Sequence, residues 1–171
     1  MLTGNKAVLR PWQEKDLPVL TEIRNDILLQ SQLMVHVRGS SQAQTREWAI
    51  ERSTKPNGLL FIIADKLTDV CIGYLQFVEI ELIERKAKFG ICLEKDPQRE
   101  GLGRELLSLA LNYLHNNFAI RKMYLEVLEE NSRAIKCYEK LGFTTCGKYH
   151  QHFFLNNKWH DAVLMEFFFN E

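Results

Sequence analysis

The sequence predicts one α/β (α+β) domain over residues 1–171, with a mixed, mostly antiparallel sheet flanked by helices. Two observations support this prediction. Strand-length and helix-period segments succeed one another in the order strand, two helices, three strands, helix, strand, helix and two strands. In addition, the three central strands are joined only by short turns, which is typical of an antiparallel meander. A chain of 171 residues fits one hydrophobic core.

The first half of the chain supplies one short strand, two helices and the meander. Ala7–Arg10 is predicted to be a strand, and the apolar spacing over residues 17–26 predicts a helix. Ser41 is a suitable N-cap for a second helix within residues 40–52. The meander strands are expected at residues 59–65, 71–83 and 86–93.

The second half begins with the clearest helical pattern, an apolar face over residues 101–118. A strand at residues 122–128 and a helix at residues 132–141 follow, and Gly142 is expected to stop that helix. Two strands, near residues 147–155 and 159–169, are predicted to join at a hairpin turn at Asn156-Asn157.

Composition excludes several classes of protein. Lys plus Arg equals Asp plus Glu at 22 each, so no basic excess indicates nucleic acid or an anionic membrane. No apolar run is long enough for a signal peptide or a membrane span. The 4 cysteines form no CxxC pair, which predicts neither a zinc site nor a disulfide framework and suits the cytoplasm.

A glycine-containing segment, Gln98-Arg99-Glu100-Gly101-Leu102-Gly103-Arg104, separates a predicted strand from the clearest helix. The first turn of a helix leaves backbone N–H groups free, and glycines let an anion approach them closely. Arg99 and Arg104 add positive charge. The segment therefore predicts a phosphate site, although a helix start that uses glycine only for packing has the same local pattern.

A second segment has the pattern N-x-x-A-x-x-x-Y-x-x-x-G-F, from Asn131 to Phe143. Asn131 lies at a strand-to-helix junction, and Tyr138 lies two helical turns later on the same face. Both side chains are therefore expected to face one cleft. A core aromatic whose hydroxyl finds some partner is the alternative for Tyr138 alone.

In their order and spacing, the two segments resemble the signatures of the GNAT acetyltransferase superfamily. The resemblance spans residue 59 to the C-terminus, and the first sixty residues match loosely. Arg99 departs from the glycine that many members carry there. The resemblance implies acetyl-coenzyme A as cosubstrate, no metal, and a sheet that splays between residues 86–93 and 122–128 to admit the cofactor.

The resemblance also assigns roles to residues. The loop from Gln98 to Arg104 would bind the pyrophosphate, and the preceding strand would hold the thioester and the pantetheine arm. Tyr138 would protonate the departing thiolate, since that leaving group departs more easily when protonated. The residues implied to bind the cofactor are Ile91, Cys92, Leu93, Gln98, Arg99, Glu100, Gly101, Leu102, Gly103, Arg104, Asn131 and Lys136.

An alkyl amine has a pKa near 10, so a base must remove a proton before the amine attacks. Glu79 is the first choice because it lies on the strand that runs beside the acetyl group in the family, and Glu81 and Glu126 are alternatives. Each carboxylate could equally be a solvated or ion-paired surface group. A covalent acetyl-Cys137 route is disfavoured, because no His–acid pairing is evident for that cysteine.

The expected acceptor is a small-molecule amine, either a polyamine or a nucleotide-linked amino sugar. Arg24-Asn25 and Gln151-His152 favour the amino sugar, whereas Glu79, Glu81 and Glu84 would suit a polycation. The N-terminus of a ribosomal protein is an alternative acceptor. A non-catalytic acetyl-coenzyme-A-binding module is the alternative from another class of protein.

Two further expectations concern the C-terminal hairpin. His150, His152 and His160 are placed to cluster, and a sheet-surface or substrate-facing role is preferred to metal binding. Phe167-Phe168-Phe169 could form an edge strand buried in a homodimer, although a strand of the domain's own core is preferred.

Overall fold

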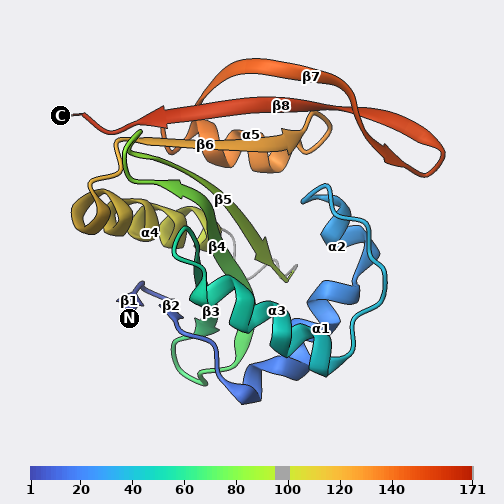
Figure 1. The fold of residues 1–171 in the computed structure, drawn as a ribbon, viewed down its shortest axis with the longest axis vertical. Coiled ribbons are helices and arrows are strands. Elements are labelled where there is room, and N and C mark those ends of the chain that lie inside the picture. Colours follow the sequence, from blue (N-terminus) through green and yellow to red (C-terminus); the bar gives the residue numbers. More distant parts are fainter. Residues whose placement is uncertain (95–100, 171) are drawn as a thin grey trace.

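The protein folds around one eight-stranded sheet with helices against it (Figure 1). The structure is a computed structural model and describes residues 1–94 and 101–170. The sheet order is β1-β2-β3-β4-β5-β6-β8-β7. The strands are β1 (Leu2–Thr3), β2 (Ala7–Arg10), β3 (Leu59–Asp65), β4 (Cys71–Glu81), β5 (Lys86–Leu93), β6 (Lys122–Leu128), β7 (Thr144–Leu155) and β8 (Lys158–Phe168).

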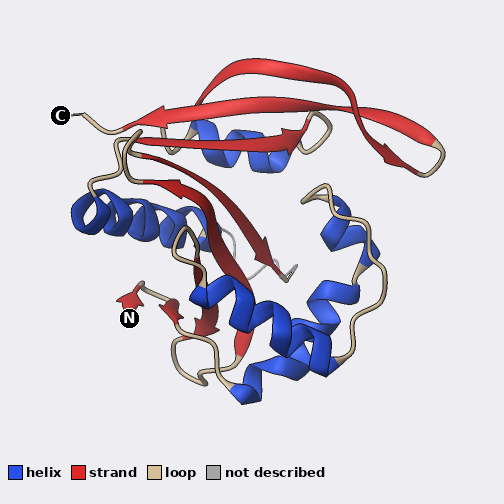
Figure 2. Ribbon diagram, in the orientation of Figure 1, coloured by secondary structure: helices blue, strands red, loops and turns tan. Residues whose placement is uncertain are grey.

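The helices divide between the two faces of the sheet (Figures 1 and 2). They are the 3₁₀ turn η1 (Glu14–Asp16), α1 (Leu17–Asn25), α2 (Ile27–Ser31), α3 (Gln42–Thr54), α4 (Leu102–Phe118) and α5 (Ser132–Glu139). Helix α4 packs on the large core that β2 to β6 share with β8, whereas α1 and α3 pack on a second apolar cluster that includes Leu60, Ile62 and Tyr74. No helix among the described residues is long and apolar enough to cross a membrane.

All neighbouring strands are antiparallel except β5 and β6, which run parallel. Their pairing covers only the register from Lys86↔Lys122 to Lys88↔Tyr124. Beyond Lys88 the two strands diverge, and Figure 1 shows β5 turning away from β6. The predicted mixed, mostly antiparallel sheet with splayed central strands is therefore confirmed.

Most predicted elements are present, and the differences lie at their ends. The helix predicted over residues 17–26 ends at Asn25, because Asp26 becomes the N-cap of the additional helix α2 and accepts the Leu29 N–H at 2.9 Å. Strand β4 stops at Glu81 rather than residue 83, and β7 begins three residues before its predicted start, at Thr144. Ser41 caps α3 as predicted, in a reciprocal capping box with Gln44.

A buried ion pair fixes the N-terminal segment that leads into α1. Arg10 and Asp16 are 2% and 1% exposed and share two hydrogen bonds of 2.8 Å. Arg10 Nε also donates to Asp69 at 2.7 Å in the β3–β4 turn, and these two carboxylates raise the pKa of Arg10. Because a lone buried charge is costly, the pairing holds α1 in register with β4.

Two of the three C-terminal phenylalanines, Phe167 and Phe169, pack against the domain's own core. Strand β8 lies between β6 and β7, but its pairing with β7 ends at Glu166, so Phe167 and Phe168 pair with β6 alone, and Phe168 is 45% exposed. Phe167 packs on Phe143 with ring centroids 5.3 Å apart, and Phe169 stacks on His115 at 4.3 Å. The preferred core packing therefore holds for Phe167 and Phe169, and the edge-strand alternative stays a prediction for the exposed Phe168.

Candidate active site

A cavity of about 1520 Å³ opens where β5 and β6 diverge. This volume exceeds the range of about 300–1,000 Å³ usual for one small-molecule pocket and is large enough for two substrates. Alternation along the strands divides the cavity between two faces of the sheet. Tyr74, Gln76 and Glu126 face the helices α1 to α3, and Ile91 and Leu93 face α4 and α5.

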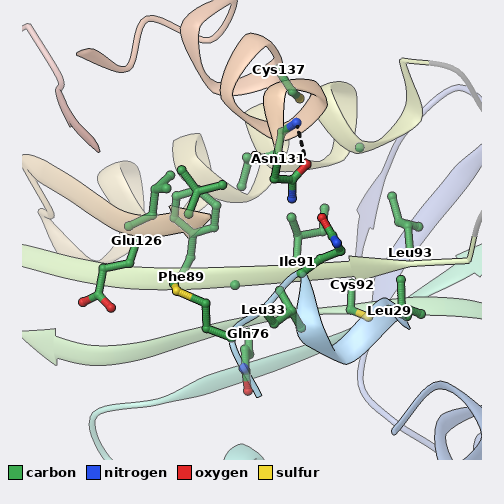
Figure 3. Close-up of a pocket in the computed structure, with 18 of the residues that line it drawn as sticks. Leu29, Leu33, Gln76, Phe89, Ile91, Cys92, Leu93, Glu126, Asn131 and Cys137 are labelled. Carbon is green, nitrogen blue, oxygen red and sulfur yellow. Dashed lines mark hydrogen bonds between the residues drawn. The ribbon is translucent and has the colours of Figure 1, made fainter. Parts of the chain in front are cut away.

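We name the two parts by the helices that border them. The α4–α5 half is lined by Phe89, Ile91, Leu93, Gly101, Gly103, Arg104, Leu107, Leu125, Val127, Asn131, Arg133, Ala134, Lys136, Cys137, Tyr138 and Lys140. The α1–α3 half is lined by Arg24, Leu29, Gln30, Gln32, Leu33, Met34, Val35, Trp48, Arg52, Tyr74, Gln76, Val78, Lys88, Gly90, Cys92, Glu94, Glu126, His152 and Phe153. In Figure 3, Glu126 and Gln76 point away from α5, which carries Asn131 and Cys137.

Strand β5 presents an open backbone edge to the α4–α5 half. The N–H of Glu94 bonds the carbonyl of Ile72 at 3.1 Å, so by alternation the amide of Cys92 also points toward β4. The amides and carbonyls of Ile91 and Leu93 then point to the other edge, where β6 no longer pairs. An extended ligand arm can add to this edge as a strand would.

The pairing of β5 with β4 assigns different surroundings to Ile91, Cys92 and Leu93, which the sequence had assigned together to cofactor binding. Ile91 and Leu93 lie as expected for backbone contacts to a cofactor. Cys92 does not, because its amide is directed to β4 and its side chain is buried on the α1–α3 side, 3.9 Å from Gln30 Nε2. Burial raises the pKa of the Cys92 thiol to about 12, so it is neither a nucleophile nor an anion at neutral pH.

The start of α4 has the features of an anion site. Gly101 is the N-cap with φ 80°, and as a glycine it has no side chain to cap the helix. The first intrahelical bond runs from Glu105 N–H to the Gly101 carbonyl, so the N–H groups of Leu102, Gly103 and Arg104 have no acceptor within the helix. A Cβ on Gly103 would lie 3.3 Å from Leu93 Cδ1, so glycine lets the helix start approach β5 closely.

Positive side chains surround this helix start. Arg104, Arg133, Lys136 and Lys140 line the α4–α5 half, and none of them forms an ion pair with a described carboxylate. Free N–H groups at the positive end of a helix dipole, beside unpaired cations, suit a polyphosphate. Gln98, Arg99 and Glu100, which the sequence also assigns to this loop, lie outside the described residues.

Asn131 and Tyr138 occupy the same half of the cavity. The side chain of Asn131 caps α5 by accepting the Ala134 N–H at 3.2 Å, which leaves its amide NH₂ group for a ligand (Figure 3). Tyr138 is half-buried between Phe89 and Phe143, with ring centroids 5.7 and 5.9 Å away. Burial raises the pKa of the Tyr138 hydroxyl, so it remains a proton donor at neutral pH.

Cys137 also lines this half, beside Tyr138 in sequence. Its pKa is raised by burial, which outweighs the opposing effect of nearby Arg104, Lys140 and Arg133. A protonated thiol is a weak nucleophile. The structure therefore gives no support to an acetyl-cysteine intermediate.

The three glutamates considered as bases lie in different places. Glu81 pairs with Lys86 at 3.2 Å and does not line the cavity. Glu79 is exposed, sits with φ 53° at a bulge of β4, accepts a hydrogen bond of 2.7 Å from the Tyr124 hydroxyl, and does not line the cavity. Glu126 lines the α1–α3 half beside the point where the strands separate. Its carboxylate lies 2.8 Å from Lys88 Nζ and 3.7 Å from His152 Nε2.

The three C-terminal histidines do not form one cluster. His150 and His160 pair with Asp161 at 3.1 Å and Glu130 at 2.8 Å, while His152 faces Glu126 in the cavity. Among the described residues, no group of three His, Cys, Asp or Glu side chains is arranged to hold a metal ion. The α1–α3 half instead contains Arg52 and Gln76, which the sequence alone did not identify. The sequence could have pointed to them only as polar residues at positions of a predicted helix and strand that otherwise face the core.

Together, these features define a class of protein. One half of the cavity can bind a polyphosphate through a helix start and an extended arm along an open strand edge. The other half reaches the same point through the gap between β5 and β6. A proton donor stands on one side and a carboxylate on the other. This is the arrangement of a two-substrate transferase that uses a nucleotide-linked carrier.

Comparison with known proteins agrees. The family described as "Acetyltransferase (GNAT) domain" matches residues 6–144, and the chain belongs to this GNAT acetyltransferase family. Its cosubstrate is accordingly acetyl-coenzyme A, and its activity is N-acetyl transfer to a primary amine.

Several curated relatives and solved structures are similar to the chain. A spermidine N(1)-acetyltransferase of Vibrio cholerae is 33% identical over 105 residues, which cover 61% of this chain and 60% of that protein. The Escherichia coli K12 enzyme of the same name is 28% identical over 164 residues, covering 96% and 75% of the two chains. The structure of the V. cholerae spermidine N-acetyltransferase with CoA and spermine aligns with TM-score 0.87 and 26% identity over 95% of both chains. A dodecameric structure of that enzyme aligns with TM-score 0.80.

We expect Gly101→Val to weaken acetyl-coenzyme A binding roughly 10- to 100-fold, the value of one charge-assisted hydrogen bond to phosphate. A β-branched residue is strained at φ 80°, so the helix start must shift. Gly39→Val is the matched control, because Gly39 also has φ 80° with open space around it but lies in the α2–α3 loop, outside the cavity lining. Isothermal titration with coenzyme A measures both, and equal losses would contradict the anion-site assignment.

Proposed function

We propose that this chain acetylates the primary amine of a small molecule bound in the α1–α3 half, by direct attack on acetyl-coenzyme A bound in the α4–α5 half. The observation that carries the proposal is the gap between β5 and β6, which connects the two halves beyond Lys88. Direct attack requires the amine and the thioester to meet without an enzyme-bound acetyl group, and the gap provides that meeting point.

In the proposed reaction, acetyl-coenzyme A supplies the activated acetyl group as a thioester. Glu126 accepts a proton from the incoming ammonium, directly or through one water molecule. The neutral nitrogen then bonds to the thioester carbon, the carbon–sulfur bond breaks, and the Tyr138 hydroxyl gives its proton to the leaving thiolate. The acetylated nitrogen loses its remaining extra proton, which restores the Tyr138 hydroxyl directly or through solvent. The open edge at Ile91 and Leu93 positions the pantetheine arm.

We assign the base to Glu126 rather than to Glu79, the first choice from the sequence. Glu126 lines the cavity, whereas the carboxylate of Glu79 is held by Tyr124 outside it. The Tyr124 hydroxyl donates a hydrogen bond to Glu79. Burial of Tyr124, together with this bond, raises the pKa of the hydroxyl. Tyr124 therefore remains a neutral hydrogen-bond donor, and its bond to Glu79 links β6 to β4 on the surface of the sheet.

Two classes of acceptor follow from different observations. The spermidine acetyltransferase relatives make polyamines the first class to test. The arginines of the α1–α3 half favour an amine that also carries a negative group, such as a nucleotide-linked amino sugar. Protein N-termini remain the third class that the sequence left open.

The test is thiol release from acetyl-coenzyme A, followed with spermidine, an amino-sugar nucleotide and an N-terminal peptide. Turnover with any small amine supports the proposal and names its acceptor class. Turnover confined to the peptide would contradict the small-molecule assignment. Binding of coenzyme A without turnover across a broad panel of amines would instead support the non-catalytic alternative.

We also propose that the protein works in the cytoplasm and associates with itself. Four free cysteines suit a reducing compartment. The dodecameric relative supports self-association, and the exposed side chains of Tyr149, Phe154 and Trp159 make the β7–β8 hairpin the expected contact. Sedimentation velocity tests this, and a monomer at all concentrations would contradict it.

A further inference from the structure

The α1–α3 half contains two arginines that form no ion pair with a described carboxylate. Arg24 on α1 and Arg52 on α3 both line the cavity and are half-buried. The Nε atoms of both are shielded from solvent and have no hydrogen-bond partner. A buried donor that stays unpartnered costs free energy, so a native structure that keeps two of them in one cavity needs an explanation.

The surroundings of Arg24 show no carboxylate. Its guanidinium lies 4.5 Å from the centre of the Trp48 ring, and one terminal nitrogen reaches Ser40 Oγ at 3.4 Å. Burial lowers the Arg24 pKa, Tyr74 opposes this effect, and Arg52 lowers the pKa further. The two guanidiniums therefore repel each other across the cavity.

Packing alone does not require this arrangement. Stacking on Trp48 accounts for one arginine, but it gives no reason for a second cation close enough to oppose the first. By contrast, Arg10, which is 2% exposed, is paired with Asp16 and Asp69. The structure thus neutralises the guanidinium of Arg10, which serves the fold, and leaves Arg24 and Arg52, which face the cavity, without an ion pair to a described carboxylate.

The remaining charges do not offset Arg24 and Arg52. Lys88 and Glu126 neutralise each other at 2.8 Å. Glu94, the other described carboxylate that lines this half, is exposed just after the end of β5. Glu51, the neighbour of Arg52 in sequence, is exposed, and its carboxylate pairs with Lys55. The segment that borders this half, residues 27–45, contains Arg38 but no Asp or Glu. Such a surface repels a polycation and attracts an anion.

We propose that Arg24 and Arg52 form a subsite for an anionic group, a phosphate or a carboxylate, on the acceptor amine. The inference rests on the proposed function, because it assigns the substrate class of the same cavity. The acceptor would place its amine near Glu126 and its anionic group between the guanidiniums, which are suited to bidentate contacts with planar or tetrahedral oxyanions. Gln76, whose Oε1 is buried without a partner on the same strand face, can accept a hydrogen bond from the amine.

The experiment compares two matched pairs of acceptors. γ-Aminobutyrate and 1,4-diaminobutane differ by a carboxylate in place of a second amine, and UDP-glucosamine and glucosamine differ by the nucleotide diphosphate. These pairs distinguish the two sources of negative charge. The wild-type enzyme should have the higher kcat/KM for the anionic member of at least one pair.

The variants are Arg24→Gln and Arg52→Gln, with Arg46→Gln as the control. Arg46 is an exposed residue of α3 that pairs with Glu14 and does not line the cavity. Each cavity variant should raise KM for the anionic acceptor by roughly 10- to 100-fold, the usual range for a charge-assisted contact. The same variants should leave kcat/KM for spermidine unchanged or higher, because a repulsive charge is removed.

This opposite response separates recognition from damage to the fold, which would lower both activities. A wild-type preference for spermidine that neither cavity variant changes would overturn the inference and leave the proposed function intact. If none of these amines is turned over, titration of UDP and γ-aminobutyrate into the coenzyme-A-saturated protein decides. If UDP or γ-aminobutyrate binds the wild type and Arg52→Gln weakens that binding, the subsite is supported. If the wild type and the variant bind equally, or neither binds, the inference is overturned.

Discussion

Replacing Tyr138 with phenylalanine is expected to lower kcat by roughly 10²- to 10⁴-fold, the usual contribution of one general acid. The ring packs between Phe89 and Phe143, and phenylalanine preserves those contacts. Only the hydroxyl is lost, so the affinity for acetyl-coenzyme A should stay within about twofold while turnover collapses. Stopped-flow thiol release and isothermal titration measure the two quantities separately.

Tyr113→Phe is the matched control for this change. Tyr113 on α4 is another partly buried tyrosine, packed edge-on against Phe61 and Phe118, and it does not line the cavity. A similar loss of turnover in both variants would assign the effect to packing and contradict the acid role. Because burial raises the Tyr138 pKa, ionisation of this hydroxyl should not limit activity until the pH passes about 10, its ordinary value.

Replacing Glu126 with glutamine should lower kcat/KM for the amine by about 10²-fold at pH 7. An alkyl amine with a pKa near 10 is almost fully protonated there, so loss of the base leaves only about one molecule in a thousand ready to attack. The glutamine carbonyl can still accept from Lys88, which limits structural disturbance. The deficit should shrink as the pH rises toward 10, because the amine then loses its proton to solvent.

Glu79→Gln supplies the contrast for Glu126→Gln, since both remove one carboxylate from the same region of the sheet. Glu79 is bonded to Tyr124 outside the cavity, so its replacement should leave kcat/KM within about twofold. Steady-state pH profiles of both variants decide between the two assignments. A larger loss in Glu79→Gln, with recovery at high pH, would restore the base that the sequence favoured.

Much of the fold was predictable because its signals are local. Hydrophobic periodicity placed β3, β5 and β6 at their observed bounds, and capping chemistry placed the start of α3 at Ser41. The short helix α2 was missed, since five residues between two extended segments carry too little periodicity. The bulge in β4 was missed too, and a strict period-2 reading therefore did not separate Glu79 from the cavity.

The two halves of the site were unequally predictable for the same reason. The glycines at 101 and 103 and the pair Asn131 and Tyr138 lie within short segments whose backbone conformation depends on their own residues. Arg24, Gln76 and Glu126 come from a helix and two strands far apart in sequence. No spacing rule links such residues, so the α1–α3 half could not be assembled from the sequence.

By itself, the sequence determined the type of domain, the glycine-containing start of α4 and the placement of Asn131 and Tyr138 on one helix face. Each depends on contacts within a few turns or strands, where glycine conformation, capping and periodicity act directly. Only the tertiary structure decided which glutamate faces the substrates, which amides of β5 stay open, and that two arginines share a cavity without an ion pair to a described carboxylate. Those outcomes depend on strand register and on the packing of α1 and α3, which are set by the whole core rather than by neighbouring residues.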